Sequence, residues 1–147
     1  MSEFLKLYEK IGKEKYGVAV GKQAPYFSTI HPKFIELKPG YCEILIENEK
    51  SVHNHLGTIH AIAICNGAEL VAGLTTEVSI PDTHRWIPVE MSVKYLGMAK
   101  TDIRVRTQCE NIDWSELGII VVPVEALNSH NELIFTAQIS MRISKKK

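Results

Sequence analysis

The segment from residue 59 to residue 74, IHAIAICNGAELVAGL, is the feature that most constrains the fold. Its only polar side chains are those of His60, Asn66 and Glu69, and all the others are apolar or glycine. A helix that is apolar on every side must be covered on nearly every side, so this segment predicts a buried helix. An ionised carboxylate in such surroundings costs several kcal/mol unless it is paired or opens to a cavity. Glu69 is therefore a candidate functional residue.

Composition limits the classes of protein to which the chain can belong. The 147 residues suit one domain, 1–147, whose core needs no disulfide or structural metal. Basic and acidic residues both number 17, and the only basic run is the terminal 145–147, so a nucleic-acid partner is not expected. Three widely spaced cysteines indicate a reducing compartment. With no signal sequence and no apolar stretch of membrane-spanning length, we expect a soluble cytoplasmic protein with no membrane partner.

Residue periodicity predicts the remaining elements. Apolar side chains at helical spacing after Ser2 predict a short amphipathic helix over 2–16. Two strand-like runs within 29–48 flank Pro39-Gly40 and predict a hairpin. Alternating apolar and polar residues predict further half-buried strands. These lie at 89–95, 103–107, 119–127 and 132–144. The expected fold is α+β, with a core over 25–144 in which an antiparallel sheet of about six strands wraps around the long helix.

A group of polar residues surrounds the predicted start of the long helix. Gly57 and Thr58 open it, and the first N–H groups of a helix lack intrahelical partners and carry the positive end of its dipole. A developing oxyanion would be stabilised there, with Asn54 and His60 as further donors. Glu69 follows His60 by nine residues, about 180° around a helix, so the two side chains face opposite ways. We expect them to meet only between two chains of a dimer.

The pattern Asn54-x-x-Gly57-Thr58-x-His60-(eight residues)-Glu69, followed by V-x-Y-L-x-x-A at 93–99, resembles the hotdog-fold acyl-CoA thioesterases. It is most similar to the phenylacetate-pathway-type branch, and there to relatives whose helix carries a glutamate. The resemblance spans about residues 25–144. It implies a hotdog fold, a homodimer or homotetramer, and hydrolysis of an acyl-CoA or acyl carrier protein thioester to free acid and thiol. It implies no cofactor, since coenzyme A is part of the substrate.

The resemblance also assigns roles to individual residues. Asn54 and the backbone N–H of Ala61, next to His60, would hold the thioester carbonyl, and Glu69 would attack it or activate water. The family usually has glycine after the histidine, whereas this chain has Ala61 and Ile62, whose side chains could narrow the site. The alternative function is therefore a non-catalytic acyl-CoA-binding hotdog module. A hydratase or dehydratase is a third hypothesis, placed last because its loop motifs are missing.

Each candidate residue also has a purely structural interpretation. Glu69 could form an ion pair with an arginine, His60 could only cap the helix, and Asn54 could only shape its loop. Asn66, three residues before Glu69, could orient that carboxylate or satisfy a neighbouring backbone group. The arginines available to Glu69 are Arg85, Arg104 and Arg106.

The substrate-binding and metal-binding predictions complete the set. Gly57 and Thr58, together with Asn66, are expected to contact the substrate, and Lys94 is expected to contact phosphate groups of the carrier. His53 and His55 have the spacing of a metal pair, but no further ligand at matched spacing follows, so we expect no metal.

Overall fold

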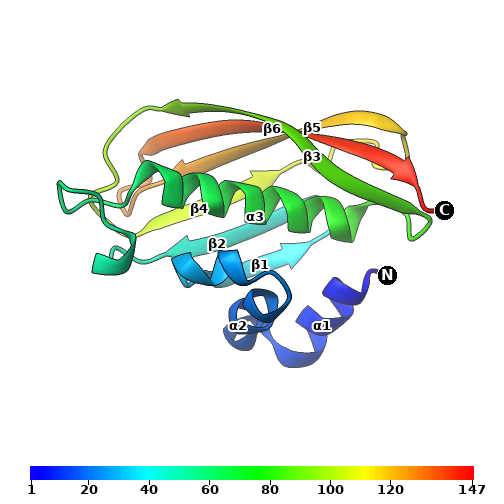
Figure 1. Cartoon of the computed structure of the whole chain (residues 1–147), viewed down its shortest axis with the longest axis horizontal. Helices are drawn as coiled ribbons and strands as arrows, with labels where there is room; N and C mark the ends of the chain where they lie inside the picture. The colour runs from blue at the N-terminus through cyan, green and yellow to red at the C-terminus, as the bar shows by residue number, and fades with distance from the viewer.

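One six-stranded antiparallel sheet curves around a single long helix, α3, as Figure 1 shows. The computed structural model describes residues 1–147. The order of strands across the sheet is β1-β2-β4-β5-β6-β3, so β1 and β3 are the edge strands. The strands are β1 (Lys33–Lys38), β2 (Tyr41–Ile46), β3 (His84–Tyr95), β4 (Ile103–Gln108), β5 (Gly118–Leu127) and β6 (Leu133–Lys145). The predicted α+β class and hairpin are confirmed, and the architecture is that of a hotdog fold.

The helix α3 runs from Ala61 to Ser79, so it begins two residues inside the apolar segment 59–74 and ends five residues beyond it. It continues past Gly73 because its last turns lie against the sheet, where the hydroxyl of Thr75 bonds that of Thr107 at 2.9 Å. Its length and apolarity would allow a membrane span, but 67% of its most apolar window is buried. It is the core helix of this fold.

Alternation along the strands supplies the sheet side of the core, as the sequence pattern predicts. On β4, Ile103, Val105 and Thr107 are buried, while Arg104 and Arg106 are on the other face. On β6, alternate residues from Phe135 to Ile143 are buried against α3 in the same way. The core therefore lies between α3 and the concave face of the sheet.

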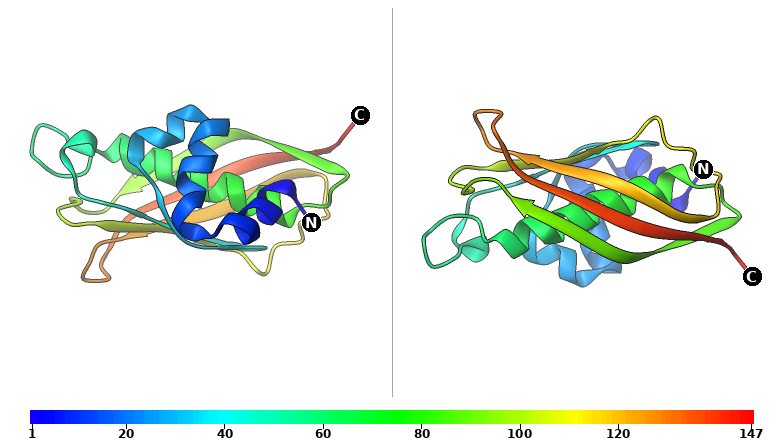
Figure 2. Two further views of the ribbon diagram at one scale, coloured as in Figure 1. Left: turned by 90° about the horizontal axis from the view of Figure 1, so that it is seen from below. Right: turned by 90° about the horizontal axis from the view of Figure 1, so that it is seen from above.

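The predicted N-terminal helix over 2–16 is wrong in its extent, because the segment forms two α-helices followed by a 3-10 helix. Gly12 has a φ of +82° and ends α1 (Glu3–Ile11) before α2 (Lys13–Gln23) and η1 (Pro25–Ile30) begin. Figure 2 shows these helices on the side of α3 away from β5 and β6. Tyr16 fixes them to the core: its ring is fully buried, and its hydroxyl donates to the carbonyl of Phe4 at 3.1 Å.

The edge strand β3 is more exposed than a half-buried strand should be. Val93 and Tyr95 pair with Ala137 and Phe135, so they face the helix side, yet Tyr95 is 59% exposed. One long edge of β3 pairs with β6, while its other edge has no strand beside it. A long unpaired edge with apolar side chains is a surface that another chain can cover.

Candidate functional site

A tight loop at 54–58 precedes α3, and Asn54 organises it. The side-chain Oδ1 of Asn54 accepts the N–H groups of Leu56 at 2.9 Å and Thr58 at 3.2 Å, and its Nδ2 donates to the hydroxyl of Thr58 at 2.8 Å. Gly57 permits the turn with a φ of +74°, and its N–H donates to the carbonyl of Asn54. The prediction that Gly57 and Thr58 open the helix is therefore wrong. Their N–H groups are used inside the loop, because the helix starts three residues later.

His60 is the N-cap of α3. Its Nδ1 accepts the N–H of Ile62 at 3.0 Å, so the neutral ring carries its proton on Nε2. The carbonyl of His60 accepts the N–H groups of Ala63 and Ile64, whereas the N–H of Ala61 has no hydrogen-bond partner within the chain. The bond from the Ile62 N–H to the His60 imidazole agrees with the interpretation of His60 as a helix cap. This cap leaves the N–H of Ala61 free at the positive end of the helix dipole.

The prediction that Glu69 is buried is wrong for the single chain. Glu69 is exposed, and it takes part in no ion pair or hydrogen bond. The arginines that could have paired with it have other partners: Arg104 and Arg106 bond Glu43 and Glu125, and Arg85 bonds Ser144. Helical periodicity shows that α3 is apolar on every side. It does not show which side the sheet and the N-terminal helices leave uncovered, and that is the side carrying Glu69.

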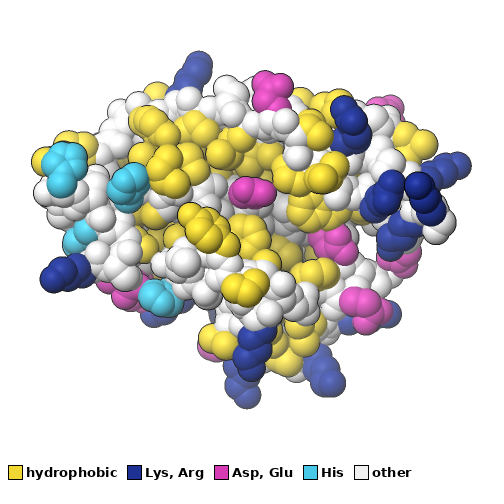
Figure 3. Space-filling view, viewed as in Figure 1, with side chains coloured by type: hydrophobic (Ala, Val, Ile, Leu, Met, Phe, Trp, Pro, Cys, Tyr) yellow, Lys and Arg dark blue, Asp and Glu magenta, His cyan; other side chains and the backbone are white.

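The surroundings of Glu69 are nonetheless apolar. It lines a cavity of about 330 Å³ between the N-terminal helices and β3, with Phe27, Leu70 and Trp86 among the other walls. Figure 3 shows hydrophobic side chains gathered on this face, with acidic side chains among them. Ile62, one of the exposed residues of α3, is 53% exposed on the same open side of the helix. An unpaired carboxylate in an apolar cavity is a common property of functional sites.

Asn66 lies beside a second cavity, of about 390 Å³, which His60, Ile62 and Tyr26 also line. Its Nδ2 donates to the hydroxyl of Thr29 at 3.1 Å and more weakly to the carbonyl of Tyr26 at 3.4 Å. Its Oδ1 is buried without a partner in the chain. The suggestion that Asn66 orients Glu69 has no contact to support it, because its amide holds η1 against α3 instead.

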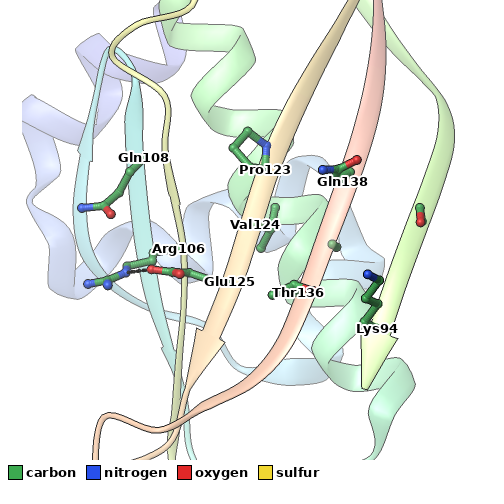
Figure 4. Close-up of a pocket in the computed structure, with 10 residues that line it drawn as sticks. Lys94, Arg106, Gln108, Pro123, Val124, Glu125, Thr136 and Gln138 are labelled. Carbon is green, nitrogen blue, oxygen red and sulfur yellow. Dashed lines mark hydrogen bonds and ion pairs between the residues drawn. The ribbon is translucent and has the colours of Figure 1, made fainter. Parts of the chain in front are cut away.

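Lys94 lies on the face of the sheet away from α3. Its neighbours Val93 and Tyr95 take the helix side, and Figure 4 shows Lys94 in a groove with Arg106, Gln108 and Glu125 on that outer face. The groove is polar, and the Nε of Arg106 donates to Glu125 at 2.7 Å. Within one chain the sheet therefore separates Lys94 from Glu69, and the structure does not bring these two predicted site residues together.

No three histidine, cysteine or acidic side chains gather in a metal-ligating group. His53 contacts Asn48 instead, with its Nε2 at 2.6 Å from the side-chain oxygen. The sequence pattern did not indicate two of the cavity residues: Phe27 lies on η1, and Trp86, expected in a loop before the strand predicted at 89–95, lies on β3. Extending the β3 alternation back from Val93 would have placed Trp86 on the outer face of the strand, because only the register shift between Pro88 and Glu90 turns it to the helix side. No sequence pattern indicates that η1 contacts α3.

The fold places the chain among the hotdog-fold proteins. Residues 12–143 match the family described as a domain of unknown function, DUF4442, and the chain belongs to that family. No curated protein matches the sequence significantly.

Three solved structures show the range of similarity. A structural-genomics protein is 43% identical with a TM-score of 0.91, covering 98% of this chain and 97% of its own. A Pseudomonas aeruginosa protein described as a probable thioesterase is 18% identical with a TM-score of 0.80, covering 88% and 93%. A Streptococcus mutans protein bound to acetyl-CoA is 17% identical with a TM-score of 0.67, covering 79% and 90%.

Proposed function

We propose that the chain is a thioesterase that hydrolyses an acyl-CoA or acyl carrier protein thioester, with Glu69 as its catalytic carboxylate. The observation that carries the proposal is the free carboxylate of Glu69 in an apolar cavity, on the same helix whose first N–H, that of Ala61, is also free. A carboxylate and a fixed oxyanion donor are the two groups that acyl transfer to water requires. The fold shared with a probable thioesterase and with an acetyl-CoA complex supports the same chemistry.

The reaction needs one base and one oxyanion site. Glu69 removes a proton from water, whose oxygen attacks the thioester carbonyl carbon, and the Ala61 N–H stabilises the resulting oxyanion. When the intermediate collapses, the C–S bond breaks, and the thiolate takes the proton from the Glu69 carboxyl to leave as the thiol. Direct attack by Glu69 would instead form an anhydride that water then hydrolyses. In either route, Asn54 fixes the loop that positions the helix start.

Two chains are needed to complete this site, because Glu69 and the helix start lie at separate places on α3. The uncovered edge of β3 and its exposed helix-side residues, Met91 and Tyr95, offer a surface for a second copy. A twofold dimer would then place Glu69 of one chain near the Ala61 N–H of the other, and make two sites. Light scattering tests this step, and a monodisperse monomer at micromolar concentration would refute it.

The decisive variant is Glu69→Gln, compared with Glu90→Gln, which removes an exposed carboxylate from the outer face of β3. Glutamine keeps the shape of the side chain but accepts no proton from water, so kcat for acyl-CoA hydrolysis should fall ~10²–10⁴-fold while KM changes little. The release of free thiol is the assay. Near-normal turnover of Glu69→Gln would show that the carboxylate has no catalytic role.

Subunit exchange tests whether the site is shared. Ala61 offers no side chain to remove, so the helix start is impaired by His60→Ala, which deletes the capping imidazole. Mixing inactive His60→Ala and Glu69→Gln proteins should restore roughly a quarter of the wild-type sites, because half the dimers are mixed and each rebuilds one site. If exchange is verified and no activity returns, the site lies within one chain.

A second candidate function is acyl-CoA binding without hydrolysis. It is favoured by Ala61 and Ile62, which follow His60 where the resembling family usually has glycine, and the side chain of Ile62 lines the cavity beside His60. Calorimetric titration with acyl-CoAs separates the two: tight binding with no thiol release across short, long and aromatic acyl groups would select the binding module.

A further inference from the structure

Trp86 is one wall of the cavity beside Glu69 and lies against α3 there. The indole of Trp86 lies directly on Gly73: a methyl group built on Gly73 would come within 2.9 Å of the ring carbon Cη2. The indole Nε1 donates to the carboxylate of Glu77 at 2.6 Å. The ring is thus anchored at two points one helical turn apart and spans α3 from Gly73 to Glu77.

The other walls of this cavity come from the N-terminal helices. Phe4 on α1, Val20 on α2 and Phe27 on η1 face α3 across it, and these side chains are apolar. The cavity of about 330 Å³ is at the small end of the range for ligand sites, ~300–1,000 Å³. Its only charged lining groups are Glu69 and the Trp86-bound Glu77. This lining suits an uncharged hydrocarbon group that ends at Glu69.

We propose that this cavity holds the acyl group of the substrate, that it selects short acyl chains, and that Trp86 sets the limit. The inference rests on the proposed thioesterase function, since it places the thioester carbonyl at Glu69. From Glu69 to Gly73 there are four residues, about 6 Å along the helix axis. With C–C bonds of ~1.5 Å in a zigzag, that length accepts roughly four to six carbons.

Removing the indole extends the cavity by a predictable length. From Gly73 to Glu77 there are again four residues, about 6 Å. Trp86→Ala should therefore move the preferred chain length up by roughly four to six carbons, from butyryl or hexanoyl to octanoyl or longer. Trp86→Phe keeps an aromatic ring on Gly73 but loses the bond to Glu77, so it should leave the preferred length short.

The experiment measures kcat/KM for acyl-CoAs of two to twelve carbons with wild type, Trp86→Ala, Trp86→Phe and the control Trp114→Phe, a tryptophan that does not line the cavity. The octanoyl-to-butyryl ratio should rise at least about 10-fold in Trp86→Ala alone. Circular dichroism confirms that each variant is folded. Should Trp86→Ala not fold, a larger side chain at the half-buried lining residue Ala24, in Ala24→Leu, should instead shift the preference to still shorter chains.

A binding series separates this inference from the proposed function. Non-hydrolysable thioether analogues of the same acyl-CoAs are titrated into Glu69→Gln and into Glu69→Gln with Trp86→Ala. A shift in chain-length preference without hydrolysis by wild type would uphold the cavity and overturn the catalysis. Hydrolysis with an unchanged chain-length profile in Trp86→Ala would overturn the cavity alone. The absence of both hydrolysis and binding would overturn both.

Discussion

Gly67 offers the sharpest test of how α3 packs on the sheet. A methyl group at Gly67 would lie 2.8 Å from Cδ1 of Ile46, and 3.5 Å from Cδ1 of Ile44 and Cγ2 of Val105. Ile46 is fully buried on β2, so its Cδ1 must shift against other buried side chains to admit the methyl group. Gly67→Ala therefore has two opposing effects on stability: it raises the helix propensity of α3, and it creates a steric overlap with Cδ1 of Ile46.

The two effects on the free energy of unfolding have comparable magnitudes and opposite signs. Alanine in place of glycine inside a helix favours folding by about 1 kcal/mol, and overpacking a buried site costs about 1–3 kcal/mol. We expect Gly67→Ala to lower the free energy of unfolding by about 1 kcal/mol. Ile46→Val alone, which removes Cδ1, should lower it by ~0.5–1.5 kcal/mol. In the Ile46→Val background the overlap is gone, so Gly67→Ala should then stabilise by about 1 kcal/mol.

Urea unfolding at one fixed protein concentration, followed by far-UV circular dichroism, measures all four free energies. The expected coupling between the two substitutions is about 2 kcal/mol, and the effect of Gly67→Ala changes sign between backgrounds. Ile44→Val is the matched control, because its Cδ1 is at ordinary contact distance and its coupling to Gly67→Ala should be near zero. Additivity within about 0.5 kcal/mol for the Ile46 pair would refute this account of the packing.

Three further predictions concern stability. Tyr16→Phe should lower the free energy of unfolding by about 0.5–1.5 kcal/mol, because the hydrogen bond to the carbonyl of Phe4 is lost, and Tyr16→Ala should lower it by about 3–5 kcal/mol. Denaturant titration will show whether the alanine variant is the less stable of the two. Glu43 is only 6% exposed and lies between Arg104 and Arg106, so Glu43→Gln should lower the free energy of unfolding by about 1–3 kcal/mol. Glu125→Gln, at the more exposed end of the same network, should lower it less, and equal losses for the two variants would contradict this prediction. Burial raises the pKa of all three cysteine thiols. As pH rises, the unfolded chain therefore loses these protons before the folded chain does, and the free energy of unfolding should fall above about pH 9 by up to ~1.4 kcal/mol per pH unit for each thiol. Alkaline titrations that find constant stability would count against this prediction.

Local sequence patterns determined the elements of the sheet and the place of the main helix. The apolarity of α3 requires that it be buried, and the alternation on β4 and β6 decides which side chains face it. The Pro39-Gly40 turn sets the β1–β2 hairpin, since both strands are close in sequence. The same segment singled out His60 and Glu69, and the family resemblance added the N–H of Ala61, but the sequence placed the helix start at Gly57 and Thr58 rather than at Ala61.

Contacts between distant segments decided the rest. β3 pairs with β6 rather than with a neighbour in sequence, which leaves it at the edge of the sheet, and the N-terminal helices cover only part of α3. These two placements together leave Glu69 exposed in a cavity. Trp86 meets Gly73 and Glu77 across the same cavity. Periodicity reports how polar each face of an element is, but the partner that covers a face is chosen by packing over the whole chain, so only the tertiary structure fixes it.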